Sequence, residues 1–274
     1  MPYTLLLAIG LLPAVSPAAG GPLESIGRLS DPTIRETSGI VKSRRYPDVF
    51  WIHSDSGNPP AIHAIRGDGR VVASFRVAIP NVDWEDMAGD ADGHLYLGEI
   101  GNNGGRLPLR AVYRVDEPDP SMPTDRPLPV TLATYYRFAR GEDRFDAESL
   151  FVVGKEAFLI AKRFGGEPAG LYSVPLEPPA PLLRPALPVL RATLPEFTEP
   201  ATGASLSEDG TLLAVVSNTA TRIYARGRDG GLTLRAAVRY KGRDIEAIAW
   251  DGLDLVLVTE AGELSRIAAK AWTE

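Results

Sequence analysis

Acidic side chains stand at both ends of an apolar hairpin in the stretch NVDWEDMAGDADGHLYLGEIGNN. Asp83, Glu85 and Asp86 come just before one short strand, and Glu99 and Asn102 come at the end of the next strand. Carboxylate and amide oxygens are the ligands that Ca²⁺ and Mg²⁺ prefer in proteins. Carboxylates held close to a substrate also serve as general acids or bases. The stretch therefore has the residue types for a cation site or a hydrolytic centre, provided that its two ends converge.

An acidic position recurs along the chain at intervals that indicate a repeating unit. Five segments share one form, in which a polar or small stretch leads into a short strand, a turn and a second apolar strand. They begin at ETSGIVKS, DWEDMAGDADG, DAESLFVVGK, ATGASLSEDG and DIEAIAWDG. Aligning the segments places these residues at one equivalent position: Glu36, Glu85, Glu148, Thr202 and Glu246. The positions are 44 to 63 residues apart, about the length of one four-stranded propeller blade.

Short strands separated by turns surround these positions. Runs rich in Val, Ile, Leu, Tyr and Phe alternate with Gly, Asp-Gly and Pro turns, a pattern typical of all-β proteins. The sequence therefore predicts an all-β, five-bladed β-propeller, with six blades or a β-sandwich as alternatives. The fifth unit lacks one strand, and the stretch PLESIGRLS near the N-terminus supplies it. Pairing of the N- and C-terminal strands would close the ring and remove an exposed sheet edge.

A propeller would bring the repeated acids together at one mouth of its channel. The first strand of each blade lines the channel, so equivalent residues just before those strands form a ring. The predicted ring consists of Glu36, Glu85, Glu148 and Glu246, with Thr202 in the fifth place. The second strand runs antiparallel to the first, so its polar end lies at the same mouth. These ends bring His53, Asp55, Glu99, Asn102, Lys162, Arg163, Asn218 and Glu260.

Several carboxylates in one ring require compensation. Two such charges about 7 Å apart repel by roughly 2 kcal/mol at an effective dielectric constant of about 20. A bound cation, raised pKa values or neighbouring positive groups would relieve the repulsion. We predict a Ca²⁺ or Mg²⁺ site with these ligands: Glu36, Asp55, Glu85, Glu99, Glu148, Glu246 and Glu260. The alternative is a structural ring, in which each Glu accepts hydrogen bonds from backbone N–H groups.

The same mouth offers groups for an anionic small molecule. The predicted ligand-binding residues are Lys162, Arg163, His53, Asn102 and Asn218. If a cation activates water or polarises a substrate there, the candidate catalytic residues are Glu85, Glu148 and Glu246, acting as ligand or general base.

Composition narrows the function classes. The chain has no cysteine, which excludes disulfides and thiolate metal sites. Its net charge is −6 and no basic stripe with interleaved aromatics occurs, so nucleic-acid binding is not expected. The three histidines lack the spacing of a zinc site.

The N-terminus suggests export. An apolar run from Leu5 to Leu12, followed by the small residues around Ala18, predicts a signal peptide over residues 1–19. The run is too short to span a bilayer. We expect a single propeller domain over residues 22–274, without a membrane span in the mature chain. The expected location is the periplasm or the exterior of a bacterium, and the expected state is a monomer.

Several motifs resemble a known group of proteins. ETSGI with WIHSDSGN, and DWEDMA with LYLGEIGNN, resemble exported bacterial β-propeller proteins that carry the pattern E-x-S-G, N-D-S-G, D-W-E-D and D-I-G-D-N. Here Ser54 stands in place of Asn, and Glu99 and Asn102 stand in place of Asp. More distantly, the D-x-E repeat is similar to calcium-binding, phytase-like and SdiA-regulated-like propellers. The resemblance implies a propeller fold and is compatible with a calcium site.

Two functions are compatible with these features. The first is an exported propeller that binds a ligand or partner at an acidic central pocket and holds a structural divalent cation. The alternative is a cation-dependent hydrolase that acts on phosphate or other small esters. The sequence contains no complete catalytic constellation, which favours the binding protein.

Overall fold

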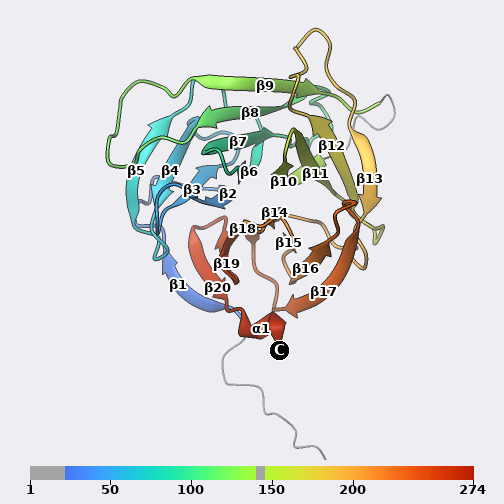
Figure 1. The fold of residues 1–274 in the computed structure, drawn as a ribbon. Coiled ribbons are helices and arrows are strands. Elements are labelled where there is room, and N and C mark those ends of the chain that lie inside the picture. The colour runs from blue at the N-terminus through green and yellow to red at the C-terminus, as the bar shows by residue number, and fades with distance from the viewer. Residues whose placement is uncertain (1–21, 140–145) are drawn as a thin grey trace, which may run out of the picture.

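The computed structural model describes residues 22–139 and 146–274. Within these ranges the chain forms five four-stranded antiparallel sheets around a common centre (Figure 1). The prediction of an all-β, five-bladed β-propeller is confirmed. The predicted signal peptide, residues 1–19, lies outside the described residues.

Each of the first four blades follows chain order from the centre outward. The first blade consists of β2 (Thr37–Lys42), β3 (Phe50–Ser54), β4 (Ala61–Ile65) and β5 (Val71–Arg76). The second consists of β6 (Trp84–Gly89), β7 (His94–Glu99), β8 (Arg110–Asp116) and β9 (Val130–Tyr136). The third consists of β10 (Asp146–Val153), β11 (Glu156–Lys162), β12 (Gly170–Pro175) and β13 (Val189–Thr193). The fourth consists of β14 (Gly203–Leu206), β15 (Leu212–Val216), β16 (Ala220–Arg226) and β17 (Leu232–Arg239).

The fifth blade joins the two ends of the described chain. It consists of β18 (Ile245–Asp251), β19 (Asp254–Thr259), β20 (Glu263–Ile267) and, on its outside, β1 (Glu24–Arg28). β1 pairs antiparallel with β20, and the two strands lie side by side in Figure 1. An ion pair of 2.7 Å between Arg266 Nη2 and Glu24 Oε2 crosses this seam. The predicted closure is therefore confirmed.

Apolar side chains fill the five interfaces between neighbouring blades. Trp51 packs in the cluster between the first and second blades, and Tyr136 packs in the next one. Phe197, Trp250 and Ile52 belong to the remaining three clusters. Complete burial of a large apolar side chain stabilises a fold by about 1.5–3 kcal/mol. These clusters fix each blade against the next and thereby fix the relative positions of the inner strands.

The inner strands β2, β6, β10, β14 and β18 contact one another around the ring. The ladders of β2, β6, β10 and β18 each skip one residue near the start of the strand. The skipped residues are Ser38, Glu85, Glu148 and Glu246. Ser38, rather than Glu36, therefore occupies the position equivalent to Glu85. The sequence alignment matched residue type at Glu36 and missed this two-residue offset.

The described part of the chain contains one helix assignment, the four-residue α1 (Lys270–Thr273). None of the described helices reaches the length and apolar character that crossing a membrane requires.

Candidate functional site

The skipped residues of β6 and β10 bring two glutamates into the interior. Glu85 is 4% exposed and Glu148 is 3% exposed. A skipped residue leaves the regular alternation of the strand, which re-aims its side chain. Glu85 thereby joins two groups of carboxylates, each with ligand atoms within 4.8 Å of one another. The first group is Asp55, Asp83 and Glu85, and the second group is Glu85, Asp146 and Glu148. We call the five residues the acidic cluster.

Two oxygens of the acidic cluster lack partners. In the described residues, neither Glu85 Oε1 nor Glu148 Oε2 has a hydrogen-bond partner, although both atoms are buried. Gly101 borders the first group, where a Cβ atom would overlap Glu85 Oε1 and lie 2.6 Å from Asp83 Oδ2. The absence of a side chain at Gly101 thus leaves room where two carboxylates face each other. Buried unpaired acceptors are costly, so this arrangement fits a cation bound by oxygen ligands.

Burial dominates the titration of these carboxyl groups. Burial, followed by the charges of Glu148 and Asp55, raises the pKa of Glu85 to about 11. Burial raises the pKa of Glu148 to about 8, even though Lys162 opposes the shift. Burial, with Asp55 and Asp146, raises the pKa of Asp83 to about 6. A divalent cation would reverse these shifts because it favours the ionised carboxylates.

Lys162, at the end of β11, is paired with the second group. Its Nζ donates to Glu148 Oε1, and its side chain is 17% exposed. Burial alone would lower the pKa of Lys162, but Glu148, with the charges of Asp146 and Glu85, outweighs burial and the pKa is raised. Glu246 lies within the field of Lys162, Glu260 and Asp55, and burial raises its pKa to about 7. Lys162 and Glu246 therefore belong to the same face as the acidic cluster.

Other predicted residues position the cluster instead of joining it. Glu99 accepts hydrogen bonds from the backbone N–H of Val82 at 3.1 Å and of Asp83 at 2.5 Å. It was predicted as a metal ligand, but its two oxygens are used to hold the segment that carries Asp83. The Asn102 N–H donates to Asp146 Oδ1 at 2.6 Å, and Asn102 Oδ1 accepts from Leu107. Buried Asn102 thus orients Asp146.

His53, predicted as a ligand-binding residue, lies in the core. Its ring is 0% exposed and lies 5.5 Å from the Trp84 ring in an edge-to-face arrangement. Gly39 makes room for the ring, because a Cβ atom there would overlap it. Burial lowers the pKa of His53 to about 4. His53 is therefore enclosed in the core, with a pKa lowered by burial.

Four further predicted residues lie outside the acidic cluster. Glu36 accepts from the Asn58 side chain at 2.6 Å and is exposed. Glu260 and Asn218 are exposed. Their backbone groups form hydrogen bonds with neighbouring segments, since the Glu260 carbonyl accepts from Thr37 N–H and the Asn218 carbonyl accepts from Arg243 N–H. Arg163 is paired with Glu167 at 3.2 Å. Glu36 and Glu260 still act on Asp55 electrostatically, since both raise its pKa after burial.

Among known proteins, no family model and no curated protein matches the chain. A chain of the nidogen–laminin complex is similar over 82% of this chain and 73% of that chain, at 9% identity and a TM-score of 0.45. The Dos1 propeller is similar over 90% and 72%, at 10% identity and 0.44. Inactive virginiamycin B lyase from Staphylococcus aureus is similar over 84% and 65%, at 12% identity and 0.42. The function is therefore argued from the geometry of the site.

Asp86 is a buried acid whose role the sequence did not indicate. It is 0% exposed, and its carboxylate accepts the backbone N–H groups of Met87, Leu150 and Ala204. The last two belong to β10 and β14, so one side chain of β6 links three blades at the centre. Burial raises its pKa, while these three donors oppose the shift. Asp86 thus accepts hydrogen bonds from backbone N–H groups on the inner edges of these strands, which have no further strand to pair with.

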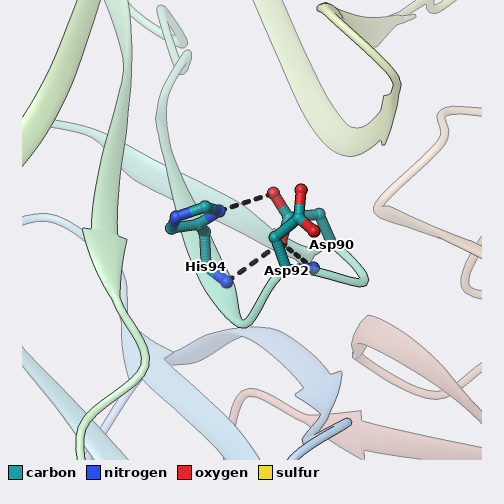
Figure 2. A group of neighbouring side chains, drawn as sticks. All are labelled: Asp90, Asp92 and His94. Atoms are coloured by element: carbon teal, nitrogen blue, oxygen red, sulfur yellow. Dashed lines mark hydrogen bonds and ion pairs between the residues drawn. The ribbon is translucent and has the colours of Figure 1, made fainter.

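A third acidic group lies in the turn between β6 and β7. Figure 2 shows Asp90, Asp92 and His94 around this turn. Asp90 Oδ1 accepts the backbone N–H groups of Asp92 and His94, and Oδ2 contacts His94 Nδ1 and the Tyr96 hydroxyl. Both oxygens of Asp90 are therefore engaged in holding the turn, unlike Glu85 Oε1 and Glu148 Oε2, which have no partner in the described residues.

The inner strands end at a cavity of about 270 Å³ on the opposite face. Its lining includes Met87, Phe151, Leu206 and Trp250, with an ion pair of 3.2 Å between Lys42 and Asp251. The cavity is lined by the ends of all five inner strands, so the acidic cluster, at the strand starts, is on the other face.

Proposed function

We propose that the protein is a ligand-binding propeller in which a divalent cation binds between Asp55, Asp83 and Glu85. The carrying observation is Glu85 Oε1, a buried carboxylate oxygen without a partner, which faces Asp83 Oδ2 beside Gly101. Leaving a buried acceptor unpaired costs about 1–3 kcal/mol, and more for a charged group. A cation at this place would remove that cost and the repulsion between the carboxylates.

The donor set favours Ca²⁺ over Mg²⁺ and over softer metals. All the acidic ligands offer hard oxygen atoms, with neither cysteine nor histidine among them. Ca²⁺ accepts six to eight oxygens in flexible geometry, whereas Mg²⁺ requires a near-ideal octahedron and retains several waters. Carboxylates that come from separate loops and strands suit the more tolerant ion. The bound cation would then hold an anionic ligand or partner at this face.

Export and the monomeric state belong to the same proposal. The apolar run and small residues of the first 19 residues support cleavage by a signal peptidase. Millimolar Ca²⁺ outside the cytoplasm would be sufficient for a site of moderate affinity. Intact-mass measurement of the exported protein should give a chain that begins near Ala19, and light scattering should give a monomer. An uncleaved cytoplasmic chain would contradict this part of the proposal.

Calcium binding to the isolated protein tests the main proposal. Thermal unfolding in EDTA and then in excess Ca²⁺ should show stabilisation, about 2.7 kcal/mol at a hundredfold excess over the dissociation constant. Glu85→Gln should abolish the shift. Asp92→Asn is the matched control, because it removes a carboxylate from the third acidic group and leaves the Asp90 hydrogen bonds in place. An unchanged midpoint with every divalent ion would overturn the proposal.

Hydrolysis of a small ester is the second candidate. Lys162 Nζ lies against Glu148, so an ammonium for an anionic substrate group is present beside the cation ligands. Half-buried Glu246 adds a carboxylate at the same face. Turnover of phosphate and carboxylic esters should then depend on Ca²⁺ and fall at least about a hundredfold in Glu246→Gln. If no ester is turned over in a cation-dependent way, the hydrolase is excluded and ligand binding is the function that stands.

A further inference from the structure

The two carboxylate groups of the acidic cluster differ in how they are neutralised. The second group, Glu85, Asp146 and Glu148, already contains a cation, because Lys162 donates to Glu148 Oε1. The ion pair of Lys162 in the described residues is with Glu148, so the first group is left for an external ion. An ammonium is a compact point charge. Here it contacts Glu148 Oε1, an oxygen that would otherwise be available to a metal ion in the second group.

The ammonium does not complete the second group. Within the part of the chain that the structure describes, buried Glu148 Oε2 has no hydrogen-bond partner, and Glu148 is 3% exposed. Asp146 Oδ1 faces the same group and is oriented by the Asn102 N–H. Lys162 and the buried Arg110 both lower the pKa of Asp146, yet Glu148 Oε2 keeps no hydrogen-bond partner among the described residues. A divalent ion supplies twice the charge and several coordination positions.

Lys162 lies at the edge of the acidic cluster, where its side chain is 17% exposed. It is the last residue of β11, and Phe164, two residues later, is largely exposed, with its ring 5.9 Å from Lys162 Nζ. Reorientation of the lysine side chain needs no movement of the strand, but it breaks the ion pair with Glu148, so a cation or an anion must replace that interaction. Movement away from Glu148 would place the ammonium toward solvent on the ligand-binding face.

We propose that Glu85, Asp146 and Glu148 form a second divalent-cation position, for which Lys162 competes. The proposal rests on the proposed function, since Glu85 would bridge the first and second cations. An anionic ligand that draws Lys162 away opens the second position, and a second cation in turn frees Lys162 for the anion. The two binding events are therefore coupled, and the coupling is reciprocal. The ligand class is a small oxyanion, such as a sulfate, phosphate or carboxylate group.

Calcium stoichiometry by isothermal titration calorimetry tests this inference. The wild type should bind one Ca²⁺ tightly and a second more weakly. Lys162→Met should tighten the second event by about tenfold or more, equivalent to about 1.4 kcal/mol. Lys155→Met is the matched control, because Lys155 is paired with Glu177 on a different part of the blade. Lys155→Met should bind both ions as the wild type does.

Further outcomes separate the two proposals. Glu148→Gln should bind a single Ca²⁺ and lose the second event, and it serves as the second variant if Lys162→Met does not fold. Adding inorganic sulfate should tighten the second cation in the wild type and have no effect in Lys162→Met. A single cation of unchanged affinity in Lys162→Met would overturn the second position and leave the proposed function standing. The absence of Ca²⁺ binding in the wild type would overturn both.

Discussion

At the scale of residues, the site depends on a glycine as much as on its acids. Gly101 carries no side chain where Glu85 and Asp83 face each other. We expect Gly101→Ala to weaken Ca²⁺ binding by at least about tenfold, because a methyl group would occupy the place of the cation. Calorimetric titration measures this loss. Gly104→Ala is the control, since a Cβ atom there meets only the flexible Arg106 side chain. Equal Ca²⁺ affinities in Gly101→Ala and Gly104→Ala would show that the cation does not bind beside Gly101.

The raised pKa values predict how stability depends on pH without metal. Burial raises the pKa values of Glu148 and Glu246 from 4.5 to about 8 and about 7. The folded protein therefore retains protons that the unfolded chain has lost. The resulting stability is complete below about pH 4.5 and is lost as the pH rises through these values. His53, with a pKa lowered to about 4, is neutral in both states above about pH 7.

We therefore expect the free energy of unfolding in EDTA to fall by a few kcal/mol between about pH 6.5 and 8.5. Urea unfolding at each pH measures the fall. Glu148→Gln should make the profile less steep, because glutamine has no proton to lose while Glu85 and Glu246 still retain theirs, and saturating Ca²⁺ should flatten it further. A wild-type profile in EDTA that stays level or rises over this range would contradict the burial of ionisable groups at this face.

At the scale of elements, the inner strands are joined through side chains. Ser38 Oγ donates to the Glu85 carbonyl at 2.5 Å, and Thr202 Oγ1 donates to the Ile245 carbonyl at 2.6 Å. Each bond runs from one inner strand to the next around the ring. The residues near the starts of the inner strands thus have two roles. The small ones connect strands, and the glutamates supply the acidic cluster.

Asp86 extends this connection across the centre, and its removal should be costly. Asp86→Ala leaves the N–H groups of Met87, Leu150 and Ala204 without their acceptor. Each buried unpaired group costs about 1–3 kcal/mol, so we expect a loss of about 3 kcal/mol or more in the free energy of unfolding. Asp86→Asn keeps one acceptor oxygen and should lose less. Urea unfolding compares them, and a loss below about 1 kcal/mol in Asp86→Ala would refute the central link.

At the scale of the whole molecule, the spacing of strands and acids was enough to predict five blades and their closure. Residue types could not fix the register, which is why Glu36 was aligned with Glu85 in place of Ser38. Asp83 and Asp146 were missed as members of the cluster, although they share the D-x-E pattern with their glutamates. Asp86 was missed because its partners are 64 and 118 residues away in the sequence. Contacts of that range become visible only once the ring is built.

Closure by β1 holds the ring together, and it predicts what loss of that strand would do. β1 covers the outer edge of β20, and Leu29 N–H donates to the Gly262 carbonyl at 2.9 Å just beyond it. Deleting residues 22–29 would expose the β20 edge, and exposed edges pair with other chains. We expect a lower unfolding midpoint and concentration-dependent association, measured by thermal unfolding and size-exclusion chromatography. Glu24→Gln should change stability by less than about 1 kcal/mol, since it removes only an exposed ion pair. A truncated chain that stayed monomeric and equally stable would mean that blade contacts alone close the propeller.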